Sequence, residues 1–163
     1  MSWVNDDGLE RKFGTEQADR ALIGEYHYDG PSHIVEITFD YTDLPAVASN
    51  SVVIDDDFTL PAGAFIESVE IWCPVDMDSA GDALTMNVGY IDTDRTNNFD
   101  VDAFVVAATQ AELITGGENV AGWVGAIVND VLPADKLLTW EVDVAAATAG
   151  EGVIRIKYYM PVT

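Results

Sequence analysis

The chain has 163 residues, of which 29 are acidic and 7 are basic, so its formal net charge at pH 7 is −22. Apolar residues make up 48% of the sequence, which is enough to form a core and argues against a disordered acidic tail. A surface this acidic repels phosphate backbones, which argues against nucleic acid as a partner. Apolar runs such as residues 103–108 are far shorter than the ~20 residues of a membrane span, so no membrane partner is expected.

The single cysteine, Cys73, cannot form a disulfide within the chain. It lies in an apolar stretch without a neighbouring histidine, and we expect a small buried side chain rather than a nucleophile. The polar, acidic N-terminus also differs from a secretory signal peptide, which is basic and then apolar. The sequence therefore predicts a fold that is held together by packing or by association.

Residues 1–30 differ in character from the rest of the chain. They hold three of the seven basic residues, and glycines interrupt them before any apolar stripe extends over two helical turns. Thr15 is placed to cap a short helix over residues 16–22. We interpret residues 1–30 as an irregular N-terminal arm and residues 31–163 as one β-sandwich domain, since this length suits a single domain.

From residue 32 onward the pattern is typical of β-strands. Residues 32–40 alternate in character, as the residues of a half-buried strand do. Further strands are predicted over residues 51–60, 64–75, 83–91, 123–128, 136–145 and 153–160. Turns are predicted at residues 61–63, which read Pro-Ala-Gly, and at residues 148–152.

The segment 102–115 interrupts this series of strands. Its apolar residues do not alternate, alanine is abundant, and Gly116-Gly117 follow, so a short helix or a helical turn is predicted there. The predicted fold class is all-β, an antiparallel β-sandwich of the immunoglobulin-like or the jelly-roll kind. The helical interruption and the long strand over residues 64–75 favour the jelly roll.

The segment 92–102 is the candidate metal site of the chain. Its oxygen ligands at alternating positions include Asp92, Asp94, Asp100 and Asp102. The register does not fit a helix–loop–helix calcium loop, because Asn97 stands where glycine is needed and Ala103 where glutamate is needed. We therefore expect no cofactor, while a looser calcium site on a β-loop stays open.

The remaining polar clusters do not indicate catalysis. Asp55-Asp56-Asp57 suggests a solvated strand edge that resists aggregation. His27 and His33 have no third ligand at zinc-site spacing, and the chain has no nucleophile motif. Among 29 acidic residues, no pair can be singled out for glycoside hydrolysis. The sequence therefore predicts no catalytic residue and no enzymatic activity.

The four tryptophans divide into two groups. Trp72, Trp123 and Trp140 lie in predicted strands, and we expect them in the core. Trp3 lies outside any predicted strand and is the better candidate for an interface anchor, since tryptophan is enriched at protein interfaces.

Several short stretches form an informative series along the chain. The first is Asp-Gly-Leu-Glu-Arg-Lys-Phe-Gly-Thr-Glu-Gln-Ala at residues 7–18, which Gly24-Glu25-Tyr26 follows. Three more stretches lie in the body, at residues 60–69, 84–89 and 148–158. In this order they resemble the small structural proteins that tailed bacteriophages encode, and the resemblance spans nearly the whole chain.

The resemblance implies a non-enzymatic virion protein, first of all a capsid decoration (cement) protein that binds the outer capsid surface and stabilises the shell. Such proteins commonly act as trimers, so the implied partners are the major capsid protein and further copies of this chain. The implied location is the capsid exterior, after synthesis in the host cytoplasm. The capsid contacts are then expected in the arm, which holds three of the seven basic residues, at Trp3, Arg11, Lys12, Phe13 and Arg20.

Alternative functions remain open at this stage. The same resemblance allows a head-fibre, neck or tail component, and a β-sandwich of this size also suits a receptor- or carbohydrate-binding module. A glycan-degrading enzyme is a weaker alternative. An acidic, lysine-poor surface is also typical of adaptation to a halophilic or marine host, which is compatible with a virion role.

Overall fold

The structure is a computed structural model that describes residues 2–4, 10–13, 23–27, 32–46, 51–96, 100–114 and 125–161. For the strands before residue 32 we describe the backbone alone. The strands are β1 (Ser2–Val4), β2 (Glu10–Phe13), β3 (Ile23–His27), β4 (Ser32–Asp40), β5 (Val52–Val53), β6 (Phe65–Ser79), β7 (Thr85–Asp92), β8 (Asp100–Thr109), β9 (Lys136–Asp143) and β10 (Ala147–Tyr159). The described residues contain no helix, which confirms the all-β class.

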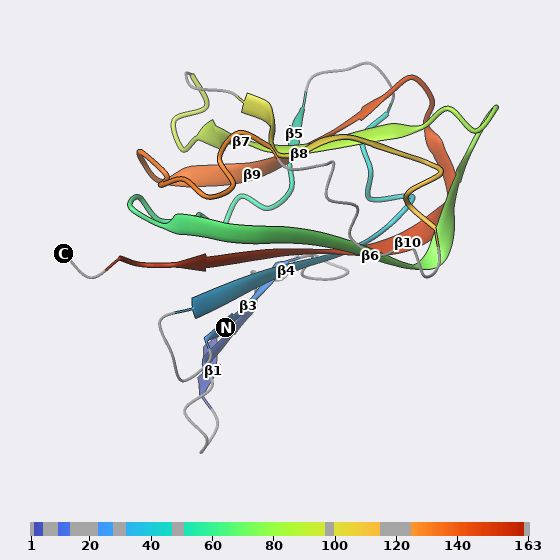
Figure 1. The fold of residues 1–163 in the computed structure, drawn as a ribbon. Helices are drawn as coiled ribbons and strands as arrows, with labels where there is room; N and C mark the ends of the chain where they lie inside the picture. Colours follow the sequence, from blue (N-terminus) through green and yellow to red (C-terminus); the bar gives the residue numbers. More distant parts are fainter. Residues whose placement is uncertain are drawn as a thin grey trace.

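The strands form two antiparallel sheets that face each other (Figure 1). The larger sheet has the order β1-β2-β3-β4-β10-β6, and the smaller has the order β5-β9-β7-β8. The long strands β6 and β10 reach the end of the sandwich, where the chain crosses between the two layers (Figure 1). This arrangement confirms the predicted β-sandwich.

The core lies between the two sheets. Along β4 the inward residues Val35, Ile37 and Phe39 are buried and alternate with more accessible ones, as the sequence pattern predicts. The ring of Phe39 meets the ring of Trp140 on β9 edge to face, at 5.9 Å between centroids. Because β4 and β9 belong to different sheets, this aromatic pair joins the two layers.

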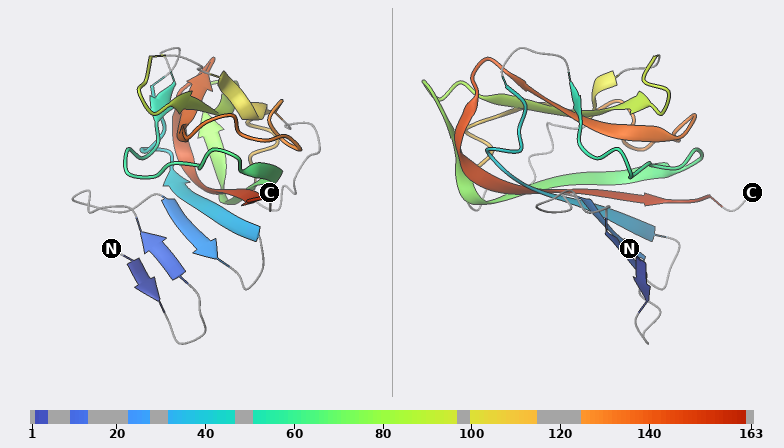
Figure 2. Two further views of the ribbon diagram at one scale, coloured as in Figure 1. Left: turned by 90° about the vertical axis from the view of Figure 1, so that its left-hand side faces the viewer. Right: turned by 180° about the vertical axis from the view of Figure 1, so that it is seen from behind.

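The N-terminal segment contains regular structure, which the sequence did not predict. Strands β1, β2 and β3 pair in sequence order and continue the larger sheet beyond β4. They extend away from the smaller sheet (Figures 1 and 2). The helix predicted over residues 16–22 lies outside the described residues, and the domain boundary at residue 30 stays a prediction.

The short helix predicted over residues 102–115 is wrong, whereas the alternative of a helical turn is met at residues 109–113, where the Leu113 N–H donates to the Thr109 carbonyl at 3.2 Å. Residues up to Thr109 belong to β8, and a turn follows them. Ala107 has a φ of 48°, and its N–H donates to the Oδ1 atom of Asn87 at 2.7 Å. The pairing of β7 with β8 is also irregular, so three successive residues, Ala103, Phe104 and Val105, are buried. This irregularity removes the alternation that normally identifies a strand.

Three further sequence predictions need correction. Residues 148–152 are part of β10 rather than a turn, and the pairing of β10 with β6 shifts register there. Only Val52–Val53 form a strand within the predicted segment 51–60. Residues 126–129 form a turn rather than a strand. In contrast, the predicted turn at Pro61 is confirmed, because the N–H of Ala64 donates to its carbonyl at 3.2 Å and Gly63 has a φ of 82°.

Candidate interaction surfaces

The outward side of β4, β10 and β6 forms an ordered array of side chains, which we call the outer face. Val35, Ile37, Ile154 and Ile156 point into the core, so the residues between them in the sequence point outward. The strand register then sets the rows of the outer face, which are Thr38, Val153 and Trp72; Glu36, Arg155 and Glu70; and Ile34, Lys157 and Ser68.

Opposite charges alternate across the outer face. The Nε atom of Arg155 donates to Oε2 of Glu36 at 2.8 Å, and Nζ of Lys157 lies 3.0 Å from Oε2 of Glu67. Among the residues that the structure describes, Glu70 takes part in no ion pair. These three rows and Glu67 therefore combine two basic side chains with three carboxylates, in a chain that is otherwise strongly acidic.

Trp72 is exposed, contrary to the prediction that it belongs to the core. It keeps 51% of its surface accessible on β6, whereas Trp140 is buried as predicted. Sequence analysis placed both in apolar strands, but only the register shows that Trp72 points outward beside Val153. Trp123 lies outside the described residues. A large exposed aromatic side chain on a sheet face is typical of a contact site.

The predicted capsid-binding residues of the arm lie on adjacent strands. Trp3 of β1 pairs directly with Arg11 of β2, and Lys12 pairs with Ser2. Phe13 ends β2, while Arg20 lies outside the described residues. The backbone therefore brings four of the five residues into one hairpin at the outer edge of the larger sheet. Their role in binding stays a prediction.

A buried lysine of β9, which the sequence alone did not indicate, lies against the start of the candidate calcium segment. The ammonium group of Lys136 contacts the carboxylate of Asp92 and lies 4.7 Å from the centre of the Tyr90 ring. Burial, followed by the charges of Asp100 and Asp92, raises the pKa of the Tyr90 phenol. The strand register could have indicated this pair, because Lys136 opens a strand that lies opposite the end of β7.

Other candidate ligands of this segment form hydrogen bonds within the chain. The Asp94 carboxylate accepts a hydrogen bond from the Thr96 N–H at 2.9 Å. Burial and hydrogen bonding to Asp102 raise the pKa of Asp100. Within the described residues, no three His, Cys, Asp or Glu side chains are grouped so that they could hold a metal ion. A calcium site that uses residues 97–99 lies outside what the structure describes.

A second group of carboxyl side chains surrounds Asn87. Its Nδ2 atom donates to the Asp143 carboxylate at 3.1 Å. Burial and the negative charges of Asp143 and Asp102 raise the pKa of Glu141, although a hydrogen bond from Asn87 opposes that shift. The acidic residues on the smaller sheet therefore repel one another in the folded protein.

The remaining polar candidates have structural surroundings. Cys73 is buried as predicted, and burial together with the charge of Asp76 raises the pKa of its thiol to about 11. His27 and His33 are paired in the β3–β4 hairpin, where the ring of His33 stacks on Tyr158 at 4.8 Å.

The three successive aspartates lie in a turn rather than in a strand. The Asp57 N–H donates to Oδ1 of Asp55 at 2.8 Å, and Asp56 makes an ion pair with Arg95. Both members of that ion pair are exposed, so the cluster is solvated as predicted even though its local structure differs.

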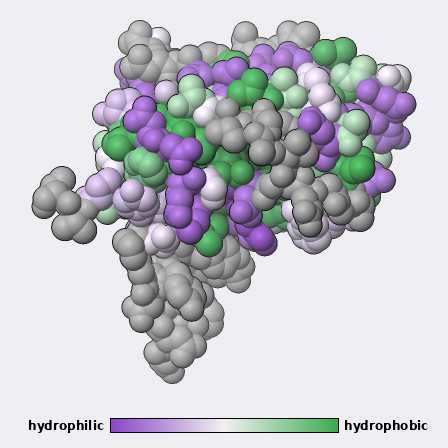
Figure 3. Space-filling view, viewed as in Figure 1, coloured by the Kyte–Doolittle hydropathy of each residue, from purple (hydrophilic) through white to green (hydrophobic). Residues whose placement is uncertain are grey.

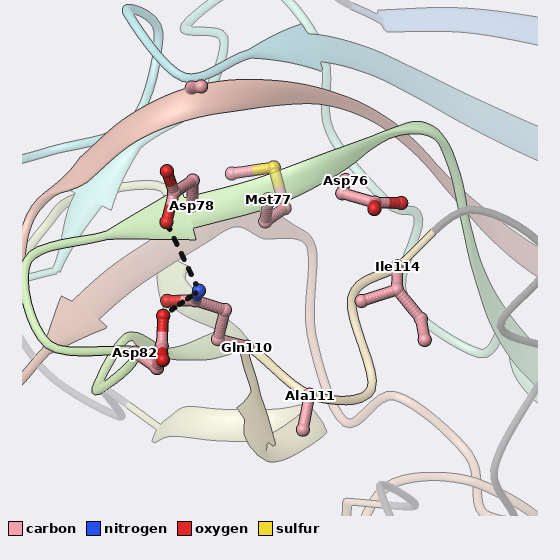
Figure 4. Close-up of a pocket in the computed structure, with 8 residues that line it drawn as sticks. Asp76, Met77, Asp78, Asp82, Gln110, Ala111 and Ile114 are labelled. Carbon is pink, nitrogen blue, oxygen red and sulfur yellow. Dashed lines mark hydrogen bonds between the residues drawn. The ribbon is translucent and has the colours of Figure 1, made fainter.

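An open pocket of about 560 Å³ lies at the end of the sandwich where β6 turns into β7 (Figure 4). The Gln110 side chain spans it, donating to Asp78 at 3.4 Å and to Asp82 at 3.2 Å. Met77 and Ile114 supply apolar lining. The pocket contains no nucleophile–base pair among these residues, and two of its three carboxylates, Asp78 and Asp82, are bound by the Gln110 amide.

The visible surface is mixed in character. On the side shown in Figure 3, hydrophobic and hydrophilic residues are interspersed. Within the residues that the structure describes, no helix is long and apolar enough to cross a membrane.

The outer face and the N-terminal strands are the two candidate contact surfaces.

Comparison with known proteins shows which structures share this fold. No protein-family model and no curated protein matches the sequence. A chain in the cyanophage Pam1 capsid asymmetric unit superposes with a TM-score of 0.53 at 21% identity, covering 90% of this chain and 98% of that one.

A second solved structure gives a similar match. A chain in the acidic stable capsid structure of Helicobacter pylori bacteriophage KHP30 has a TM-score of 0.52 at 16% identity, with coverage of 86% and 95%. A chain in the capsid of Ralstonia phage GP4 has a TM-score of 0.47 at 16% identity. The first two matches show that the chain shares the fold of chains present in phage capsid structures.

Proposed function

We propose that this chain is a non-enzymatic virion structural protein of a tailed phage, and specifically a decoration protein on the outer surface of the capsid. The observation that carries this proposal is the fold shared with two capsid chains over nearly their full lengths. Since those alignments cover 98% and 95% of the matched chains and 90% and 86% of this one, the compared chains are similar in length.

The charge distribution supports an exterior position. A chain with a net charge of −22 repels packaged DNA, so it is better suited to the outside of a shell than to its lumen. A decoration protein stabilises a shell through the contact area that it adds between neighbouring subunits. No catalytic group is needed for this role.

The N-terminal hairpin is the proposed capsid contact. It extends the larger sheet away from the smaller one, and its backbone brings Trp3, Arg11, Lys12 and Phe13 together (Figure 2). The sandwich body would then hold the copies of a homotrimer together. This division separates capsid binding from self-association.

Co-sedimentation with capsids of the encoding phage tests the proposal. We expect the full chain to sediment with capsids, and a chain that lacks residues 1–20 to stay in the supernatant with its oligomeric state unchanged. The double variant Arg11→Glu/Lys12→Glu keeps β1 and β2 and is expected to bind weakly. Full capsid binding by the truncated chain would overturn the assignment to the hairpin, and no binding by the full chain would overturn the decoration role.

A receptor- or carbohydrate-binding module is the second candidate. The observation in its favour is the exposed Trp72, because sugar rings stack on flat aromatic side chains. Glycan-array binding that Trp72→Ala abolishes would favour this candidate, and the absence of any glycan signal would remove it.

A further inference from the structure

The outer face differs in charge from the rest of the chain. Among the residues whose side chains the structure describes, the basic ones are Arg95, Lys136, Arg155 and Lys157. Lys136 is buried, so two of the three accessible basic side chains lie on the outer face. Glu36, Glu67 and Glu70 stand beside them, so this part of the face has a net charge of only −1, whereas the next row contains the acidic pair Asp40 and Glu151.

Charge limits where two copies of this chain can meet. Each copy carries a net charge of −22, so most orientations of two copies bring acidic surfaces together. Among the surfaces whose side chains the structure describes, the rows of the outer face are the exception, because each copy offers both signs there and its basic side chains can face the carboxylates of the next copy. Its ion pairs are also partly exposed, with 49% of the Arg155 and 22% of the Glu36 side chain accessible in one pair, and 39% of Lys157 and 42% of Glu67 in the other. Exchanging partners between copies therefore has a small energetic cost.

The outer face also has an apolar anchor. Trp72 is 51% exposed and lies beside Val153 in the row next to Arg155. Tryptophan and arginine are the residue types that most often dominate binding energy in protein interfaces. The face therefore combines an aromatic anchor with paired charges.

We propose that copies of this chain associate through the outer face, with Trp72 as the anchor and with Arg155 and Lys157 facing carboxylates of the neighbouring copy. This inference rests on the proposed function, which calls for a homo-oligomer, and it names the surface that forms the oligomer. Glu70 makes no ion pair among the described residues and supplies a carboxylate for the neighbouring copy.

Light scattering of the full chain tests the anchor. The wild type is expected to have the mass of three 17.6 kDa chains, and Trp72→Glu the mass of one at the same concentration. Val144→Glu is the matched control, because Val144 is an equally apolar side chain that is 68% exposed at the β9–β10 turn. It is expected to associate like the wild type. Circular dichroism confirms that both variants are folded.

A charge-exchange experiment tests the pairing. Arg155→Glu/Lys157→Glu and Glu36→Lys/Glu67→Lys/Glu70→Lys are each expected to be single chains, because like charges then face each other between copies. An equimolar mixture is expected to associate again, because opposite charges face each other wherever the two variants meet. The control Asp55→Lys/Asp56→Lys/Asp57→Lys changes the net charge as much as the second variant and is expected to keep the wild-type mass.

The outcomes separate this inference from the proposed function. A single-chain wild type, an associated Trp72→Glu variant or a mixture that does not assemble would each overturn the outer-face contact. If single chains still sediment with capsids, the decoration role stands without this contact. If the oligomer forms but does not sediment with capsids, the contact stands and the decoration role falls.

Discussion

The ammonium group of Lys136 contacts the carboxylate of Asp92 directly across the β7–β9 pair, although the Lys136 side chain is only 1% exposed. The backbone of Lys136 is fixed as well, because its N–H and carbonyl both form hydrogen bonds with Leu60. In a chain with so few basic residues, this buried lysine neutralises the end of β7, where the acidic segment 92–102 begins. An internal ammonium group therefore supplies positive charge at this end of the segment.

Breaking this pair should destabilise the fold strongly. We expect Asp92→Asn to lower the free energy of unfolding by about 3 kcal/mol, because it leaves a buried charge without its partner. The matched change is Asp56→Asn, which breaks the exposed ion pair with Arg95 and should cost less than about 1 kcal/mol. Urea denaturation of both variants measures the difference. Equal effects of the two substitutions would show that Lys136 is not held by Asp92.

Gly89 is expected to be intolerant of any side chain. A Cβ atom there would lie 1.9 Å from the carbonyl oxygen of Asp100, which is main chain and cannot move aside independently. Gly89→Ala should therefore cost more than about 3 kcal/mol, in the range of severe packing defects. Gly81→Ala is the control: Gly81 has a φ of 77° but open space around it, so about 1–2 kcal/mol is expected. Thermal unfolding compares them, and a Gly89→Ala variant as stable as Gly81→Ala would contradict the close approach.

The fold should be more stable at mildly acidic pH than at pH 7, because two acidic side chains of the smaller sheet are then protonated. Burial is the main cause that raises the pKa values of Asp100 and Glu141. At a pH just above the ordinary carboxyl pKa values, the folded state therefore binds more protons than the unfolded state. The penalty that these two groups impose is present at pH 7 and is relieved as the pH falls through their raised pKa values.

The variant Asp100→Asn/Glu141→Gln isolates this effect. It should be more stable than the wild type at pH 7, and the difference should shrink as the pH is lowered from 7 to 4. Denaturation midpoints across this range measure it. A difference that grows on acidification would mean that these carboxyl groups are stabilised in their charged form.

Cys73 should be chemically inert in the folded protein. Burial and the charge of Asp76 raise the pKa of its thiol to about 11, so little thiolate is present at pH 8. A chromogenic disulfide reagent is expected to label the denatured chain fully and the native chain only at the rate of unfolding. Labelling of the native protein at the rate of a free thiol would contradict the burial.

Sequence reasoning succeeded where a strand has one face in the core. Over β4 the alternation around Val35 and Ile37 predicted both the strand and its buried side, because one layer covers that side of the sheet. It failed at β8, where the irregular pairing around Ala107 places successive residues in the core. It also failed at Gly150, where a strand with shifted register contains the residues of a turn.

The candidate surfaces were predicted only in part. The basic and aromatic residues of the arm stood out by composition, and the hairpin then brought Trp3 and Arg11 together. Trp72 was missed because an apolar strand does not reveal which of its residues face outward when the pairing shifts between Trp72 and Val75. The alternating charges of the outer face come from three strands far apart in the sequence, so only the sheet order reveals them.

Cryo-electron microscopy of intact virions of the encoding phage is the most direct test of the decoration role. The account predicts density that fits the two-sheet sandwich on the outer surface of the shell, with the N-terminal hairpin against the major capsid protein. Density for the chain in the interior or at the tail alone, or the absence of the chain from purified particles, would contradict it.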